Sequence, residues 1–175
     1  MTKIFSVMRI GISVFLIELA GVMLVLSYGL ADADLKYSAD LSGFSEVPQI
    51  FSQGTGIAKI SGNDTILNYQ INATGIENVT AVSINKGEET ENGQVLVNLS
   101  APKIPTGPNQ ERMIQGIITN SSLQGPLAGK TIKDLVDLMN QNGTYVNINT
   151  TKFPRGELRG AIVNLGNSTD SAPSG

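Results

Sequence analysis

The residues best able to do chemistry in this 175-residue chain are carboxylates, because the sequence holds neither histidine nor cysteine. The chain therefore lacks the commonest general base near neutral pH, the thiolate nucleophile and the commonest transition-metal ligands. Glu88, Glu89 and Glu91 lie close together, and calcium accepts carboxylate oxygens as ligands. Their spacing is not that of a calcium-binding loop, so a solvated acidic loop is the favoured interpretation. We expect no catalytic residue, no cofactor and no enzymatic activity.

A second segment, Gly125-Pro-Leu-Ala-Gly-Lys-Thr131, looks like a phosphate-binding loop but fails its spacing. The motif needs four residues between its glycines, whereas three separate Gly125 from Gly129, and Gln124 stands where the first glycine belongs. Charged residues make up 15% of the chain, and the net charge is -3. Because no basic face is available to neutralise phosphates, nucleic acid is not an expected partner.

Eight Asn-x-Ser/Thr triplets are acceptors for N-glycosylation, which indicates an exported protein with a glycan-bearing surface. Accidental triplets in a β protein rich in Asn and Thr are the alternative interpretation. The triplets begin at Asn63, Asn72, Asn78, Asn98, Asn120, Asn142, Asn149 and Asn167.

The N-terminus carries an export signal or a membrane anchor at residues 1–33. Lys3 and Arg9 precede an apolar stretch at residues 10–26, and the small-x-small pattern that ends at Ala33 is typical of signal-peptidase cleavage. A retained anchor is the alternative, although 17 apolar residues containing Glu18 are short for a membrane span. A soluble hydrophobic helix is a third alternative. In the first two cases the rest of the chain is extracytoplasmic: secreted, or held at the membrane by residues 10–26 alone.

From residue 35 to about 165 the apolar residues alternate with polar ones, which predicts half-buried strands in one domain. The expected strands lie at 35–41, 55–60, 67–73, 79–85, 94–99, 112–118, 144–150 and 157–163. About eight short strands separated by Gly, Pro and Asn clusters indicate an all-β fold, an antiparallel β-sandwich or barrel.

One short helix interrupts the strands near residues 131–141. Its apolar residues recur at helical spacing, Thr131 with Asp134 forms a capping pattern, and Gly143 is the expected stop. The tail at residues 166–175 has no apolar face and is expected to be disordered.

The order of motifs along the domain resembles the CHRD (chordin-type) family. Its opening motif corresponds to Tyr37-Ser-Ala-Asp-Leu-Ser-Gly-Phe-Ser-Glu-Val-Pro48, and its closing motifs to Thr144-Tyr-Val-Asn147 and Pro154-Arg-Gly-Glu-Leu-Arg-Gly160. With the segments between them these cover residues 37–163. The resemblance implies a Greek-key fold like that of the dismutases and immunoglobulins.

The resemblance also singles out six motif positions. Glu157 and Arg159, at alternate positions of one strand, are expected to form a local ion pair, and with Glu46 they would otherwise make a polar site. Relatives often carry histidines, arranged like the copper ligands of copper/zinc superoxide dismutase, where this chain has Ser83, Asn85 and Asn149. Because amide oxygen binds copper and zinc poorly, we expect no metal there, and a hydrogen bond between Asn85 and Asn149 in its place.

The leading functional hypothesis is a non-catalytic extracytoplasmic module that binds a protein or a surface polymer, or has a structural role at the cell surface. A metal-dependent, dismutase-like oxidoreductase and a self-assembling envelope subunit are the alternatives.

Overall fold

The computed structural model describes residues 35–88, 90–99 and 111–166. The expected leader at 1–33, the expected tail at 166–175 apart from Gly166, and Glu89 and Asn167 lie outside these residues. The described elements are β1 (Leu35–Ser42), η1 (Gly43–Ser45), β2 (Thr55–Gly62), β3 (Leu67–Thr74), β4 (Val79–Lys86), β5 (Val95–Leu99), β6 (Arg112–Ile118), η2 (Asn120–Ser122), η3 (Gly125–Leu127), α1 (Ile132–Asn140), β7 (Thr144–Thr150), β8 (Leu158–Ala161) and β9 (Val163–Asn164).

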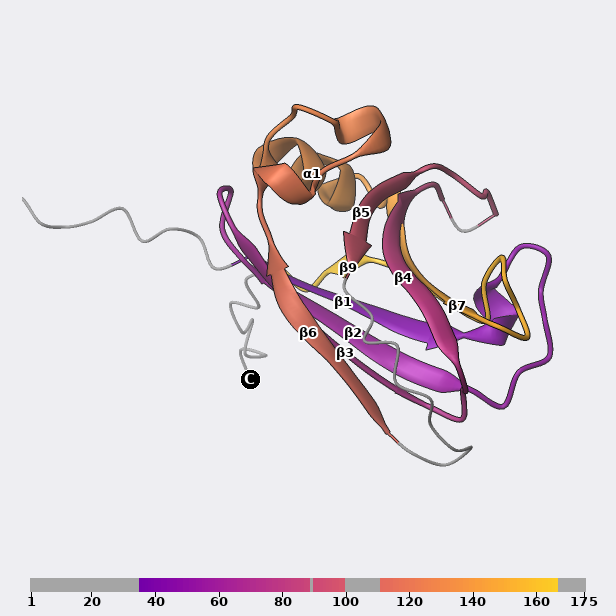
Figure 1. Ribbon diagram of the computed structural model, residues 1–175. Coiled ribbons are helices and arrows are strands. Elements are labelled where there is room, and N and C mark those ends of the chain that lie inside the picture. Colours follow the sequence, from indigo (N-terminus) through magenta and orange to yellow (C-terminus); the bar gives the residue numbers. More distant parts are fainter. Residues whose placement is uncertain (1–34, 89, 100–110, 167–175) are drawn as a thin grey trace, which may run out of the picture. The chain divides into compact units, whose positions relative to one another are not determined.

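The strands form one antiparallel sheet that curls into a nearly closed barrel (Figure 1). Their order is β5-β4-β7-β8-β1-β2-β3-β6, and the short β9 also pairs with β1. β6 lies beside β3, and β7 lies beside β4, so each of these strands returns next to the strand three places earlier, as in a Greek key. The prediction of an antiparallel all-β fold with one helix is therefore confirmed.

The core follows directly from the alternation of apolar residues. In β3, for example, Leu67, Tyr69, Ile71 and Ala73 are buried between more exposed polar neighbours. The expected last strand at 157–163 is divided, because Ile162 turns into the core between β8 and β9.

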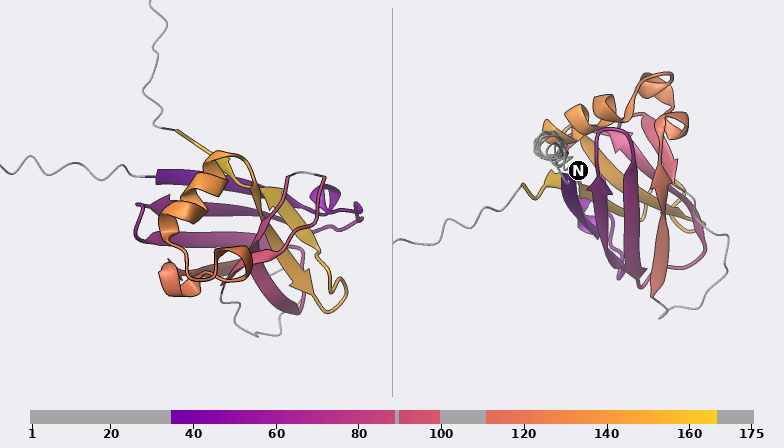
Figure 2. Two further views of the ribbon diagram at one scale, coloured as in Figure 1. Left: turned by 90° about the horizontal axis from the view of Figure 1, so that it is seen from above. Right: turned by 90° about the vertical axis from the view of Figure 1, so that its left-hand side faces the viewer.

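Helix α1 lies across one end of the barrel (Figures 1 and 2), where Asn140 Oδ1 accepts hydrogen bonds from the Tyr37 hydroxyl of β1 at 2.9 Å and from Asn164 Nδ2 of β9 at 2.7 Å. It buries Ile132, Leu135, Val136 and Met139. The Asp134 carboxylate accepts hydrogen bonds from the Thr131 N–H and hydroxyl at 2.8 and 2.7 Å, which confirms the capping pattern and lowers the pKa of Asp134.

The expected stop at Gly143 was wrong by one residue. Asn142 adopts the left-handed conformation that ends the helix, with φ 55°.

Candidate functional site

The outer face of β4, β7 and β8 carries a row of polar side chains that are buried although they point away from the core. Antiparallel pairing aligns Ser83 with Asn147 and Asn147 with Arg159, while Asn85 aligns with Tyr145. Paired residues share a face of the sheet, so these five side chains form one layer, which we call the polar layer. Their exposed fractions are between 1% and 8%. A buried polar face needs a cover and internal hydrogen bonds.

Three loops provide that cover: residues 43–54, the described residues of 87–94, and residues 151–157. In Figure 1 the first and third lie together at the right-hand end of the domain. Loops 43–54 and 87–94 meet where the Asn92 amide donates to the Val47 carbonyl at 2.6 Å. The polar layer is therefore enclosed between the sheet and three segments that are far apart in the sequence.

Ser83, Asn85 and Tyr145 form a continuous hydrogen-bond chain in the polar layer. The Ser83 hydroxyl donates to Asn85 Oδ1 at 2.7 Å, and Asn85 Nδ2 donates to the Tyr145 hydroxyl at 3.3 Å. Tyr145 also accepts from the Gly93 N–H at 3.2 Å. This chain attaches loop 87–94 to the sheet.

Arg159 is 1% exposed and is the most tightly held member of the layer. Its guanidinium lies 3.6 Å from the centre of the Tyr145 ring, a cation–π contact. It donates to Asn92 Oδ1 at 2.9 Å, to the Glu91 carbonyl at 2.8 Å and to the Glu88 carbonyl. A buried charge is thus stabilised largely by carbonyl dipoles and an aromatic face.

The contacts of Arg159 also explain how Glu88 and Glu91 of the acidic loop are oriented. Glu88 and Glu91 turn their carbonyls toward Arg159 and expose their side chains. Among the described residues no three acidic side chains gather in a way that would hold a metal ion.

Asn147 and Asn149 attach the loop at 151–157. Asn147 Nδ2 donates to Asn149 Oδ1 at 3.0 Å and to the Arg155 carbonyl at 3.2 Å, and Asn149 Nδ2 donates to the Pro154 carbonyl at 2.6 Å. The expected bond between Asn85 and Asn149 was wrong, because the register places Asn149 opposite Ala81 and Asn85 opposite Tyr145.

Glu157 and Arg159 also have different partners from those expected. The Glu157 carboxylate accepts from the Ser52 hydroxyl at 2.8 Å and from the Thr150 hydroxyl at 2.7 Å. Arg159 turns to the loop at 87–94, and the described contacts include no ion pair between the two. Glu157 therefore fastens loop 43–54 to the sheet.

Glu46 is the buried carboxylate without such partners. It is 6% exposed, and its Oε1 accepts no hydrogen bond from the described residues. Burial raises the pKa of Glu46 to about 7, and the positive charge of Arg159 opposes this rise.

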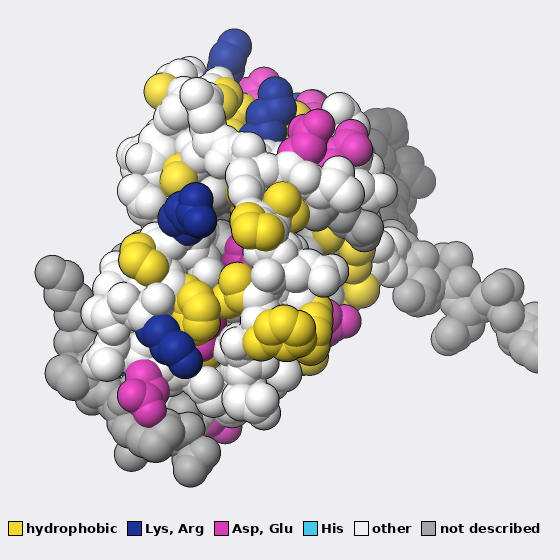
Figure 3. Space-filling model, turned by 90° about the vertical axis from the view of Figure 1, so that its right-hand side faces the viewer, with side chains coloured by type: hydrophobic (Ala, Val, Ile, Leu, Met, Phe, Trp, Pro, Cys, Tyr) yellow, Lys and Arg dark blue, Asp and Glu magenta, His cyan; other side chains and the backbone are white. Residues whose placement is uncertain are grey.

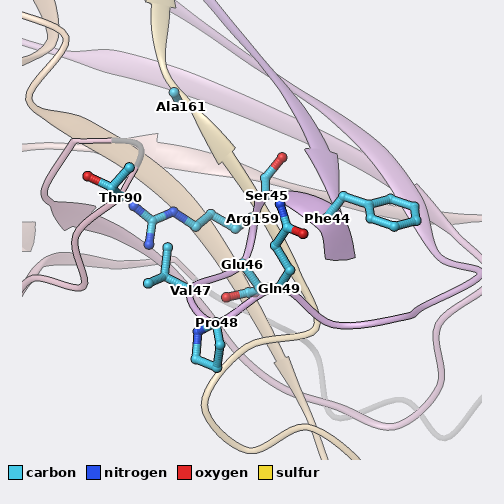
Figure 4. Close-up of a pocket in the computed structure, with 9 residues that line it drawn as sticks. All are labelled: Phe44, Ser45, Glu46, Val47, Pro48, Gln49, Thr90, Arg159 and Ala161. Carbon is cyan, nitrogen blue, oxygen red and sulfur yellow. The ribbon is translucent and has the colours of Figure 1, made fainter.

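Glu46 and Arg159 both line a pocket of about 550 Å³ at this end of the domain. Figure 4 shows its walls: residues 44–49 on one side, and Thr90, Arg159 and Ala161 on the other. Of the six motif positions, the structure brings Glu46 and Arg159 together at this pocket. Ser83 and Asn85 are not among the residues that line it, and Glu157 and Asn149 hold the loops.

An exposed aromatic pair lies at the edge of this pocket. Phe44, which lines it, is 59% exposed, and Phe51 is 90% exposed. Their rings meet edge to face with centroids 5.8 Å apart. Figure 3 shows this end of the domain, where hydrophobic side chains gather and only scattered charged ones lie among them.

The side chains at Ser83, Asn85 and Asn149 do not fit a copper or zinc ion. They offer neutral oxygens and amides that already bond to one another, to Tyr145 and to backbone carbonyls. They therefore do not supply the imidazole or thiolate donors that such a metal prefers.

Tyr145 and Asn147 were not predicted from the sequence to belong to a site. The signal was present, because residues 145, 147 and 149 are an aromatic and two amides alternating with the buried Val146 and Ile148. Such a strand has two covered faces.

The acceptor asparagines differ in exposure. Asn78, Asn98, Asn120 and Asn142 are exposed, whereas Asn63, Asn72 and Asn149 are half-buried. No acceptor falls within residues 35–62 or 79–97, which include both loops beside the pocket.

Comparison with protein families finds the CHRD domain over residues 37–162. The chain belongs to the CHRD family. The match covers the range of the motif series and confirms the resemblance. The searches of curated proteins and of solved structures returned no match.

Proposed function

We propose that this CHRD protein is a non-catalytic, extracytoplasmic binding module, and that it binds a protein or a surface polymer at the mouth of the pocket beside Phe44. The observation that carries this proposal is the pocket itself. It has apolar and polar walls, a floor fixed by Arg159 and an exposed aromatic ring at its edge. Preformed concave sites of mixed polarity are where proteins commonly bind ligands.

The absence of catalysis is supported by the chemistry of the residues. The chain has no histidine and no cysteine, and the polar layer beside the pocket bonds mainly to itself and to the loops. In the part of the chain that the structure describes, no nucleophile or second acid–base group is placed to act with Glu46.

The extracytoplasmic location rests on the sequence. The hydrophobic N-terminus and the eight glycan acceptors favour export, and the loops beside the pocket carry no acceptor. Among the described residues no helix is long and apolar enough to cross a membrane. The mass of the mature chain tests cleavage: we expect an N-terminus at Asp34, and a chain beginning at Met1 would contradict it.

Binding is tested by co-sedimentation of the full-length chain with cell envelopes prepared from the organism that produces it. Phe44→Ala is the test variant, and Met113→Ala is the matched control, since Met113 is 58% exposed on β6. We expect the wild type and the Met113→Ala variant to be retained and the Phe44→Ala variant to lose retention at least tenfold. Equal retention of the two variants, or no retention of the wild type, would contradict the proposal.

Self-assembly into an envelope layer is a second candidate, favoured by the sheet edge at β6. This strand has one neighbour, β3, among the described strands, and it exposes Met113 and Ile117. Light scattering during size-exclusion chromatography decides: a monomer at high concentration contradicts self-assembly.

A further inference from the structure

Glu46 is a buried carboxylate whose surroundings suit the acid better than the anion. It follows the 3-10 turn η1, so its backbone is fixed while its side chain points inward against Gly156. A Cβ at Gly156 would lie 2.4 and 2.7 Å from the two carboxylate oxygens of Glu46 and 2.8 Å from Asn147 Oδ1. Three oxygens thus converge on the space that only a glycine leaves open.

The amide of Asn147 cannot turn to help an ionised Glu46. Its Nδ2 is engaged by Asn149 Oδ1 and the Arg155 carbonyl, which leaves Oδ1 on the side of Glu46. The Glu46 oxygens and Asn147 Oδ1 all lie within 2.8 Å of the position that a Cβ of Gly156 would take, and acceptors gathered in this way in a buried site repel unless a proton lies between them. A carboxylic acid at Glu46 supplies that proton.

The charged groups around Glu46 do not take the place of this proton. The guanidinium of Arg159 is directed to loop 87–94, and Glu157 is occupied by two hydroxyls. Lys152 and Arg155 line a second pocket beside Glu46, of about 220 Å³, but both are exposed to solvent. The side chains of Glu88 and Glu91 are exposed as well, and their negative charge disfavours a further anion.

We propose that Glu46 is a proton-binding site that closes loop 43–54. As an acid, Glu46 donates a hydrogen bond to Asn147 Oδ1. When this proton leaves to solvent, the carboxylate turns toward Arg159 and the loop loosens. Burial, which raises the pKa of Glu46 to about 7, places this change near neutrality. The neighbours of Glu46 in sequence, Ser45 and Val47, line the larger pocket. Movement of Glu46 is therefore passed to the pocket wall.

The consequence for binding rests on the proposed function of that pocket, whereas the protonation itself does not. If the pocket binds its ligand as proposed, affinity changes across neutral pH. Loop 43–54 keeps two further attachments, at Val47 and at Ser52, so loss of the proton loosens the loop without releasing it.

The test is a carboxyl-carbon NMR titration of the full-length chain from pH 4 to 9, followed also at the Gly156 amide. We expect one glutamate to titrate with a midpoint near 7, to vanish in the Glu46→Gln variant and to move the Gly156 signal. A midpoint for Glu46 below 5 would overturn the proposal, and the wild-type Gly156 signal reports this even if the variant does not fold.

Hydrogen exchange of loop 43–54 tests the closing step. After correction for intrinsic rates, we expect exchange in the wild type to rise at least fivefold from pH 5.5 to pH 8 and to stay slow in Glu46→Gln, whose amide can donate to Asn147. The control Glu157→Gln weakens the contact with Ser52 and should raise exchange at both pH values, but it keeps the pH response. Equal exchange of loop 43–54 at both pH values would contradict the proposed closing of this loop by protonated Glu46. Neither experiment needs a ligand, so failure here is distinct from failure of envelope retention.

Discussion

The Glu46→Gln substitution should make the stability of the domain less dependent on pH. In the wild type the pKa of Glu46 rises from 4.5 to about 7 on folding. Because the folded pKa lies above the unfolded one, the stabilising contribution of the proton is complete below pH 4.5 and is lost as the pH rises to 7. Glutamine has no proton to lose and keeps a donor for Asn147.

The size of the effect follows from the shift. One pKa unit corresponds to about 1.4 kcal/mol, so a difference from 4.5 to about 7 sets an upper limit of about 3 kcal/mol. Solvent in the adjoining pockets screens the site, and we therefore expect about 1 to 2 kcal/mol.

The assay is urea unfolding of the full-length chain at pH 4.5 and at pH 8, followed by circular dichroism. The advantage of the Glu46→Gln variant over the wild type should grow by about 1 to 2 kcal/mol between the two pH values, with equal m-values. Glu157→Gln serves as the control, since it weakens two hydroxyl contacts and should destabilise at both pH values. A difference between variant and wild type that does not change with pH would refute the reasoning.

Three further predictions test the polar layer. Replacing Arg159 with Met leaves two carbonyls and Asn92 without their donor and removes the contact with Tyr145. Chemical denaturation should show a loss of about 3 kcal/mol in the free energy of unfolding. A loss below about 1 kcal/mol would contradict the role of Arg159. Gly156→Ala combines a φ of 147° with a clash against Glu46 and should cost at least about 2 kcal/mol, where a neutral effect would show that the carboxylate lies elsewhere. Elemental analysis of the purified protein should find no stoichiometric copper or zinc, and finding either would revive the oxidoreductase hypothesis.

Much of the fold was predictable because strands that are buried on one face carry apolar residues at every second position of the sequence. Leu67 to Ala73 is a typical case, where every second residue is apolar and the strand is half-buried. The capping pair Thr131 and Asp134 was equally visible, because both partners lie within one helical turn. Local patterns of this kind can be recognised in the sequence without knowledge of the tertiary structure.

The partners of the polar residues were less predictable, because they depend on register and on distant loops. Asn85 and Asn149 stand on neighbouring strands, yet the pairing places three residues between the row of Asn149 and the row of Asn85. Arg159 lies beside Glu157 in sequence but bonds to a loop about seventy residues earlier. The burial of Glu46 follows from Gly156, which no pattern connects to it.

The most direct test of the central claim, that the domain binds through the mouth of its pocket, is site-specific photo-crosslinking in the native envelope. A photoreactive residue replaces either Gln49, which lines the pocket, or the exposed Gln115 on β6 of the full-length chain. We expect a discrete crosslinked product from position 49 that is absent at position 115. Crosslinking from position 115 alone, or equally from both, would contradict the account.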